Sequence, residues 1–327
     1  MSNSGPGKIV DLDQATRLLK SGELVAFPTE TVYGLGADAL NKSAVAKIFS
    51  TKGRPENHPL IVHVADFQVA RTWSAGFSES AVRLAKKFWP GPLTLIVKRA
   101  DFVPPRVTGG QDTVGLRVPA HPVAQQLLVQ FGGGIAGPSA NRFGKVSPTS
   151  AQDVVEEFAG IPLAVLDGGK STVGIESTIV DCSGNSLAIL RPGFVTAEQI
   201  FECLGIMPRG RENDSPRTAG THKSHYAPNA KVILLPEDEV DAFFLQTTRS
   251  ESNRYLACFS GRPPQGKNIV WHPVPDDPAE LANQLYSLFR QADAENFTHV
   301  VFVQPEQKGV GTAVADRLNR AAARFNG

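Results

Sequence analysis

The sequence is poor in cysteine, in long apolar runs and in net charge. Its three cysteines, Cys182, Cys203 and Cys258, form an odd and widely spaced set, which predicts reduced thiols rather than a disulfide framework. No run of about 18 apolar residues occurs, so the sequence predicts no membrane-spanning helix. Residues 1–7 are polar and lack the apolar core of a secretory signal. We therefore expect a cytoplasmic protein without a membrane partner.

Positive and negative charges are balanced along the chain. Lysine and arginine total 33, and aspartate and glutamate total 32, for a net charge of +1. Residues 1–205 contain 19 basic and 18 acidic residues, and residues 206–327 contain 14 of each. Neither part has the basic excess of a general nucleic-acid-binding protein. This balance does not exclude a local basic groove.

Length and hydrophobic pattern predict an α/β protein of two domains. A chain of 327 residues exceeds the roughly 250–300 residues at which a single core stops growing. Apolar segments of strand length alternate with amphipathic segments of helix length, which predicts helices layered on a mixed sheet. Residues 177–181 and 187–190 flank a Ser-Gly-Asn turn and predict an antiparallel hairpin. The other predicted strands are 24–27, 60–64, 93–97, 113–118, 135–136 and 164–167, and the predicted helices are 13–20, 44–51 capped by Ser43, 79–88, 123–131 and one capped by Thr149 or Ser150 that ends at Phe158.

The composition changes near residue 208. Residues 208–224 are rich in Pro, Gly, Arg, Asn and Ser and contain almost no large apolar residue, which is typical of a linker. Beyond them, a pattern of three strands and three helices predicts a small Rossmann-like α/β unit with parallel strands. We therefore divide the chain into a first domain at 8–205, a linker at 206–230 and a C-terminal α/β domain at 231–327. The three strands are expected at 232–235, 254–259 and 299–303, with helices at 240–245, 279–292 and 313–325.

Two short motifs resemble ligand sites but lack residues that those sites require. Gly169-Lys170-Ser171 looks like the end of a phosphate-binding P-loop, but Ala164 occupies the position of the first glycine, and the residues that follow read as extended. His222 and His225 have no Cys or acidic partner at the spacing of a zinc site. The sequence therefore predicts no protein-bound metal centre.

Four polar segments rich in Gly and Pro stand where predicted strands end, which is where α/β proteins place their chemistry. In the second of them Lys52 and Arg54 flank a glycine, and in an extended loop both side chains would project to one side and suit a polyphosphate. His63 lies inside an apolar strand, where a histidine is more often a core group than a ligand. The other segments offer hydroxyls and backbone N–H groups for phosphate or carboxylate oxygens. The four segments are 27–36, 52–63, 137–149 and 168–178.

Together these segments resemble one family, the YrdC/Sua5 family. A C-terminal His225-Tyr226-Ala227-Pro228 followed by a small α/β domain is similar to the long, two-domain Sua5 branch. The motifs that carry the resemblance are 27–36, Lys52-x-Arg54, 89–94 (WPGPLT), 115–119 (GLRVP), 138–141 (PSAN), 174–178 (GIEST) and 189–193 (ILRPG).

The resemblance implies both a fold and an activity. The catalytic domain of the family is a twisted, open, mixed α/β sheet with a positively lined cavity. Its members are L-threonylcarbamoyladenylate synthases, a nucleotidyltransferase activity that converts L-threonine, bicarbonate and ATP to threonylcarbamoyl-AMP and pyrophosphate. A downstream threonylcarbamoyl transferase then modifies adenosine 37 of tRNA. Contact between this chain and tRNA is not required.

The resemblance also implies roles for individual residues. Some members carry a threonine where this chain has Gly137, so a contact there would have to come from backbone. By motif position, the catalytic signature is Lys52, Arg54, Ser139 and Asn141, L-threonine is bound by Thr31, His63, Arg117 and Ser177, and ATP is bound by Arg54, His58, Thr113, Ser139, Ser147, Arg191 and Tyr226.

The expected chemistry depends on positioning and charge. The carbamate of L-threonine attacks the α-phosphorus of ATP, so two anions must meet among fixed cations. We expect Mg²⁺ to arrive with ATP, because the motifs offer no carboxylate cage. We also expect the linker, anchored at Tyr226, to act as a lid that excludes water. Two alternatives stay open: an RNA-binding module, and a transferase that forms a carbamoyl-adenylate.

Overall fold

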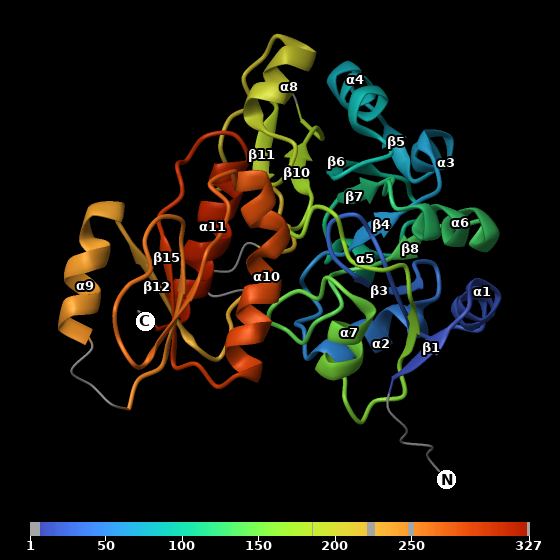
Figure 1. Cartoon of the computed structure of the whole chain (residues 1–327). Helices are drawn as coiled ribbons and strands as arrows, with labels where there is room; N and C mark the ends of the chain where they lie inside the picture. The colour runs from blue at the N-terminus through green and yellow to red at the C-terminus, as the bar shows by residue number, and fades with distance from the viewer. Residues whose placement is uncertain (1–6, 185, 221–225, 248–251, 326–327) are drawn as a thin grey trace. The chain divides into compact units, whose positions relative to one another are not determined.

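The computed structural model describes residues 7–184, 186–220, 226–247 and 252–325. The chain divides into two compact units (Figure 1). The first consists of residues up to Phe143 and of Ser147–Thr221, and the second of Gly144–Val146 and the chain from His222 onward. His222 and His225, which the sequence excludes as zinc ligands, lie outside the described residues.

The first unit is built on a mixed sheet, as the alternating pattern predicts. Eleven strands of the described part form it in the order β1-β9-β2-β3-β8-β4-β7-β6-β10-β11, and β5 pairs with β6 at one side. The predicted hairpin is confirmed, because β10 pairs with β11 in antiparallel register. The strands are β1 Lys8–Val10, β2 Val25–Phe27, β3 Gly34–Asp38, β4 Ile61–His63, β5 Ser74–Gly76, β6 Leu93–Arg99, β7 Thr113–Arg117, β8 Ile135–Ala136, β9 Ala164–Leu166, β10 Thr178–Asp181 and β11 Ala188–Arg191.

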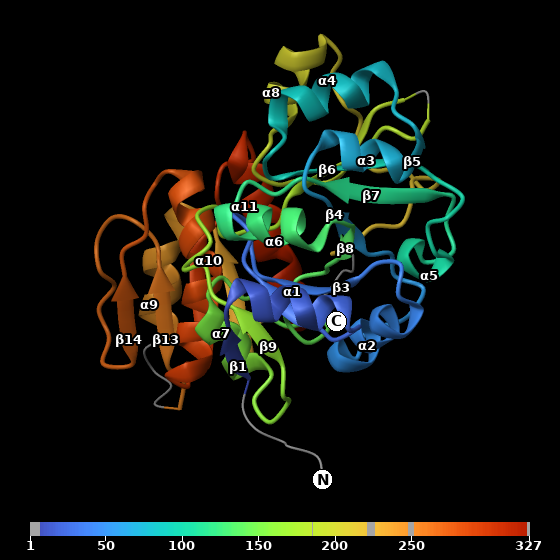
Figure 2. The ribbon, with the colours of Figure 1, turned by 90° about the vertical axis from the view of Figure 1, so that its right-hand side faces the viewer.

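Eight helices of the described part of this unit cover the sheet. Helix α1 packs beside α6, and α4 packs beside α8 (Figures 1 and 2). Ser150 caps α7, which confirms one of the two caps predicted there, Thr149 or Ser150. The cap predicted at Ser43 is wrong, because Asn41 Oδ1 accepts the N–H groups of Ser43 and Ala44 at 3.0 and 3.1 Å. The helices are α1 Leu12–Lys20, α2 Lys42–Lys52, α3 Phe67–Thr72, α4 Glu79–Phe88, α5 Pro105–Thr108, α6 Pro122–Phe131, α7 Ala151–Glu157 and α8 Ala197–Leu204.

Strand β3 is absent from the predicted elements because it is rich in glycine. It pairs antiparallel with β2, and Phe27 of β2 lies opposite Gly34. A Cβ atom at Gly34 or Gly36 would come within 3.0 Å of the Phe27 ring. The glycines therefore make room for a buried aromatic ring inside a sheet, a role that strand propensity does not signal.

Alternation along the central strands gives the sheet two different faces. Val62, Leu95 and Leu116 point into the main core, which also contains buried residues of α2, α4, α7 and α8. Their neighbours in sequence, which include His63, Thr94 and Arg117, must therefore point to the opposite face. Two smaller apolar clusters lie on this opposite face. In one of them α1 and α6 pack on Phe27 and Ile135. The other consists of Ile61, Ile96, Ile179, Ala188 and Leu190. We call this second side the polar face, because its central strands carry His63, Thr94 and Arg117 there.

Residues 206–220 make hydrogen bonds within the first unit. The Arg209 N–H donates to Leu187 O, and the Ile189 N–H donates to Arg209 O, both at 2.9 Å. Farther on, the Arg217 N–H donates to Gln111 Oε1 at 2.7 Å. The predicted lid begins in this segment, and its lid function stays a prediction.

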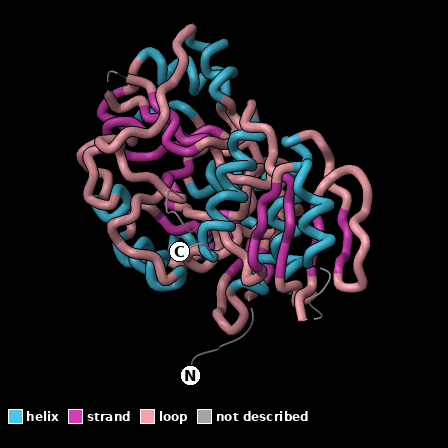
Figure 3. Tube along the Cα trace, turned by 90° about the vertical axis from the view of Figure 1, so that its left-hand side faces the viewer, coloured by secondary structure: helices cyan, strands magenta, loops and turns pink. Residues whose placement is uncertain are grey.

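The second unit contains four parallel strands in its described part, so the three-strand prediction is wrong. Their order is β12-β15-β13-β14 (Figure 3). The missed strand β14 lies at the edge, and its apolar run, Ile269-Val270-Trp271, is shorter than the runs of four to eight residues that predict a strand. The parallel pairing itself is confirmed. The elements are β12 Lys231–Leu235, β13 Tyr255–Cys258, β14 Ile269–His272 and β15 His299–Val303, with α9 Val240–Thr247, α10 Pro278–Ala294, α11 Val310–Ala322 and short 3₁₀ turns at Glu237–Glu239 and Ala323–Phe325.

A buried arginine organises one side of this second unit. Arg317 of α11 has no exposed surface, and its guanidinium lies over the Tyr226 ring at 5.2 Å from the centroid. Tyr226 also stacks on Tyr286 with 5.8 Å between ring centroids. Tyr226 has a φ of 63°, a left-handed conformation that is unusual for a residue other than glycine. Packing on both sides of the ring therefore holds a strained backbone in place.

We expect Arg317→Ala to lower the free energy of unfolding by roughly 2–5 kcal/mol, because it leaves a cavity beside the Tyr226 ring. The control is Arg262→Ala in the same unit, where the arginine is exposed, with an expected change of at most about 0.5 kcal/mol. Urea unfolding of the full chain measures both variants. Equal effects of the two substitutions would contradict this account of Arg317.

Candidate active site

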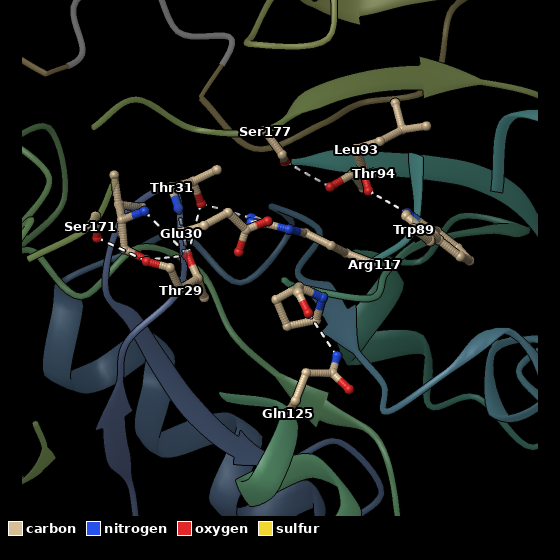
Figure 4. A network of polar contacts seen from close by, with 12 residues as sticks. Thr29, Glu30, Thr31, Trp89, Leu93, Thr94, Arg117, Gln125, Ser171 and Ser177 are labelled. Atoms are coloured by element: carbon tan, nitrogen blue, oxygen red, sulfur yellow. Dashed lines mark hydrogen bonds and ion pairs between the residues drawn. The ribbon is translucent and has the colours of Figure 1, made fainter. Parts of the chain in front are cut away.

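Arg117 is the central charged group of the polar face. It ends strand β7, next to His63 of β4 in the parallel register. Its Nη1 donates to Thr31 Oγ1 at 2.9 Å, and its Nη2 lies 2.8 Å from Glu30 Oε1 (Figure 4). The Arg117 side chain is only 4% exposed and that of Glu30 only 8%. Arg117 and Glu30 thus form a buried ion pair, which joins the end of β7 to the loop after β2.

The turn that carries Thr31 is fixed by its own side chains. Thr29 Oγ1 accepts the N–H groups of Thr31 and Val32, each at 3.2 Å, and also lies 2.8 Å from Thr31 Oγ1. Ser171 Oγ donates to Thr29 O at 2.9 Å (Figure 4). Because these contacts set the backbone, the Thr31 hydroxyl is held in one place before any ligand binds.

Ser177 forms a second polar centre, immediately before β10. Its hydroxyl lies 2.8 Å from Thr94 Oγ1 of β6 (Figure 4). Arg191 of β11 donates to the Ser177 carbonyl from Nε at 3.1 Å and from Nη2 at 2.9 Å, and Nη2 also reaches Ser177 Oγ at 3.2 Å. Arg191 is thus held side-on against the residue that the sequence assigns to L-threonine.

The predicted catalytic signature is brought together, but not by an extended loop. Lys52 is the last residue of α2, and Gly53 ends that helix in the left-handed conformation, so the extended-loop expectation is wrong. Lys52 Nζ donates to Ser139 O at 2.6 Å and also to Asn141 O. Burial, and then the charge of Arg54, hold the Lys52 pKa well below its ordinary value. Arg54 Nη2 donates to Pro59 O at 3.0 Å.

His63 is a buried, neutral histidine. It is 2% exposed and packs edge-on against Phe27, with 5.4 Å between ring centroids. Burial, together with the charge of Arg117, lowers its pKa from 6.5 to about 3. Its Nδ1 has no hydrogen-bond partner among the described residues. His63 is thus a core group with one ring nitrogen, Nδ1, that is buried and has no partner in the described part of the chain.

The four remaining predicted ATP contacts have different surroundings. Ser147 Oγ donates to the buried Glu176 Oε1 at 2.6 Å. The His58 ring lies 5.5 Å from the Phe143 ring, and Thr113 lines a cleft on the polar face together with Ile61, Ile96, Ile179 and residues 217–219. Tyr226 belongs to the second unit, so its contact with ATP stays a prediction.

The buried charges of the first unit do not balance. Among its described residues, the buried cations are Lys52, Arg54, Arg117 and Arg191, and the buried carboxylates are Glu30 and Glu176. Neither carboxylate is among the predicted site residues, although each lies inside a quoted motif next to one that is. An excess of enclosed positive charge suits an anionic ligand, because desolvated cations are costly unless an anion faces them.

Neither a metal centre nor a membrane span is found in the described part of the chain. No group of three or more His, Cys, Asp or Glu side chains there could hold a metal ion. No helix there is both long and apolar enough to cross a bilayer.

Two family models match consecutive parts of the chain. The Sua5/YciO/YrdC model, described as "Telomere recombination", matches residues 17–193. A model described as "Threonylcarbamoyl-AMP synthase, C-terminal domain" matches residues 195–323. Sequence and structure thus point to the same kind of protein, a mixed α/β fold with a cation-rich polar face. The chain belongs to the Sua5/YciO/YrdC family, and the resemblance read from its motifs is confirmed.

Individual relatives cover nearly the whole chain. The threonylcarbamoyl-AMP synthase of Pyrococcus abyssi is 39% identical over 317 residues, which cover 94% of this chain and 93% of that protein. The Bacillus subtilis threonylcarbamoyl-AMP synthase is 37% identical over 330 residues, which cover 94% and 92%. A crystal structure of P. abyssi Sua5 complexed with L-threonine matches at a TM-score of 0.89 with 37% identity, covering 96% of this chain and 97% of that one.

We expect His63→Gln to flatten the dependence of stability on pH. Below pH 6.5 the unfolded chain protonates His63, whereas the folded chain resists protonation until about pH 3. Stability is therefore lost as pH falls through this window, by at most about 1.4 kcal/mol per pH unit from this one group.

Urea unfolding at pH 8.5, 7.5, 6 and 5 measures the effect. The wild type should lose more stability than His63→Gln between pH 7.5 and 5, and the two should change in parallel above pH 7.5. Identical slopes across the acidic window would show that His63 is not held neutral in the fold.

Proposed function

We propose that this chain is an L-threonylcarbamoyladenylate synthase that converts L-threonine, bicarbonate and ATP to threonylcarbamoyl-AMP and pyrophosphate. The observation that carries the proposal is the group of four buried cations, opposed by two buried carboxylates, on a unit whose hydroxyl-rich loops are already fixed. The similarity to threonylcarbamoyl-AMP synthases over 94% of the chain supports it. The reaction is a nucleotidyl transfer, because the adenylyl group of ATP passes to a carbamate oxygen.

We assign the Arg117 side of the polar face to L-threonine. Arg117 presents a guanidinium to the substrate carboxylate, and Thr31 is oriented beside it by the 2.9 Å hydrogen bond. Ser177 offers a hydroxyl, and the neutral ring of His63 offers Nδ1 without adding a competing charge. The related P. abyssi protein, crystallised as a complex with L-threonine, supports this substrate.

We assign the loops around Lys52 to ATP. Lys52 fixes the Ser139 and Asn141 backbone by donating to both carbonyls, while Arg54 adds a charge beside them. Arg191 is positioned for the α-phosphate region by its contacts with Ser177. The other ATP contacts that we propose are His58, Thr113, Ser147 and Tyr226.

The residues act by positioning and by charge. The carbamate oxygen attacks the α-phosphorus as the bond to pyrophosphate breaks, and fixed cations offset the repulsion between the two anions. No step requires a covalent bond to the protein. Mg²⁺ fits as a counter-ion that ATP carries, since the side chains we assign to the phosphates are cations and hydroxyls; it would neutralise phosphate charge.

We further propose which reaction consumes the product. A carbamoyl-adenylate is an activated acyl donor, so a downstream transferase must consume it, and we infer that it passes the threonylcarbamoyl group to adenosine 37 of tRNA. The cytoplasm, where tRNA is modified, is the location that we propose. The balanced charge of the chain agrees with a protein that need not hold tRNA itself.

Pyrophosphate release tests the proposed function. Purified protein with ATP and Mg²⁺ should release pyrophosphate only when both L-threonine and bicarbonate are present. Release with carbamoyl phosphate, and indifference to L-threonine, would instead identify a carbamoyl-transferring enzyme. Salt-sensitive RNA binding with no release under any combination would identify an RNA-binding module.

Within that assay, Arg54→Ala should lower the rate about 10²- to 10³-fold, because it removes a fixed cation from the phosphates. The matched control is Arg71→Ala, since Arg71 is an exposed arginine on α3, a helix that packs against the main core. The control should keep the wild-type rate. A rate for Arg54→Ala that matches the control would remove Arg54 from the phosphate site.

A further inference from the structure

Glu30 is a buried carboxylate that the assignments above leave unused. It is 6% exposed, and neither of its oxygens accepts a hydrogen bond from the described residues. Its one charged contact within the described part of the chain is the 2.8 Å approach of Arg117 Nη2 to Oε1. Buried carboxylates in folded proteins usually accept several hydrogen bonds, so a donor for these oxygens remains to be identified.

The backbone around Glu30 holds this carboxylate in place. Thr29 and Thr31 on either side are tied by the hydroxyl contacts described above. The Glu30 carbonyl accepts the Val173 N–H at 2.7 Å, which joins this turn to the loop before β10. Figure 4 shows the Glu30 side chain directed at the Arg117 guanidinium, beside Thr31. The carboxylate is therefore aimed at the place that we assign to L-threonine.

The charge of the substrate matches this arrangement. L-threonine carries a carboxylate and an ammonium on the same carbon, so a site that holds one with Arg117 must accept the other nearby. Glu176 is already engaged by the Ser147 hydroxyl, and Lys52 acts as a donor to two carbonyls. His63 lies beside Arg117 in the sheet register but is a poor proton acceptor at neutral pH, with a pKa of about 3. Among the described residues of the first unit, Glu30 is the remaining buried carboxylate.

We propose that Glu30 binds the ammonium group of L-threonine and removes its proton for carbamate formation. Condensing that ammonium with bicarbonate forms one C–N bond, breaks one C–O bond and releases one water and one proton. The Glu30 carboxylate accepts that proton from the nitrogen, which frees the lone pair for attack on carbon, and later passes the proton to solvent. This inference rests on the proposed function.

Binding measurements test the first half of the proposal. The ligands are L-threonine and the hydroxy acid in which a hydroxyl replaces its amine. Glu30→Gln should lower the affinity for L-threonine about 10- to 100-fold, because a charge-assisted contact is lost. It should change the affinity for the hydroxy acid by less than about 3-fold. Equal losses for both ligands would mean that Glu30 only supports Arg117, and would overturn the proposal. Unchanged ATP affinity shows that the variant is folded.

Reaction in the two directions tests the proton transfer. The forward reaction requires the ammonium to lose its proton, whereas ATP formation from threonylcarbamoyl-AMP and pyrophosphate does not. Glu30→Gln should slow forward pyrophosphate release about 10²-fold or more at saturating L-threonine and leave reverse ATP formation within about 3-fold of wild type. Glu30→Asp should recover part of the forward rate.

The outcomes separate this inference from the proposed function. Equal slowing in both directions would place Glu30 in adenylyl transfer and overturn the proton-transfer role. A wild type that makes threonylcarbamoyl-AMP yet binds L-threonine and the hydroxy acid equally well would overturn the role of Glu30 alone. A wild type that neither binds L-threonine nor releases pyrophosphate would overturn the function itself.

Discussion

The rest of the structure depends on how the first unit buries positive charge. Lys52, Arg54, Arg117 and Arg191 are all nearly inaccessible to water, and each loses hydration that the protein must replace. Carbonyl oxygens replace part of it at Lys52 and Arg191, and Glu30 does so at Arg117. The loops that supply these groups must therefore be rigid, because a cation whose partners moved away would be buried at full cost.

Backbone pairing between loops provides that rigidity. The Tyr33 N–H donates to Pro148 O, the Leu35 N–H to Pro138 O and the Ala140 N–H to Tyr33 O. These bonds join the loop after β2, which carries Thr31, to the segment between β8 and α7, whose carbonyls Lys52 contacts. The groups assigned to L-threonine and those assigned to ATP are therefore held rigidly together. The sheet gives both loops a fixed base, since one face of each central strand is packed into the main core.

Much of this could be predicted from the sequence, and the failures have physical reasons. Long, regular elements such as α4 show clear periodicity, and the site motifs stand out as polar loops at strand ends. Strand β3 is missed because its glycines make room for Phe27 and carry no strand signal, and β14 because its apolar run is only three residues long. Glu30 is missed for another reason: its role depends on Arg117, 87 positions later, which only the folded sheet brings within 2.8 Å.

The distribution of charge within the first unit mirrors the difference in charge between L-threonine and ATP. Around Arg117 the positive charge is matched by Glu30, and His63 is neutral, so this part is balanced and suits a zwitterion. Lys52, Arg54 and Arg191 are opposed by Glu176 as the one other buried carboxylate of the described first unit, which leaves an excess that suits a polyphosphate. Because the region around Arg117 has no net charge, it also does not attract a triphosphate to the L-threonine position. Selectivity between the two substrates would thus follow from local charge as well as from shape.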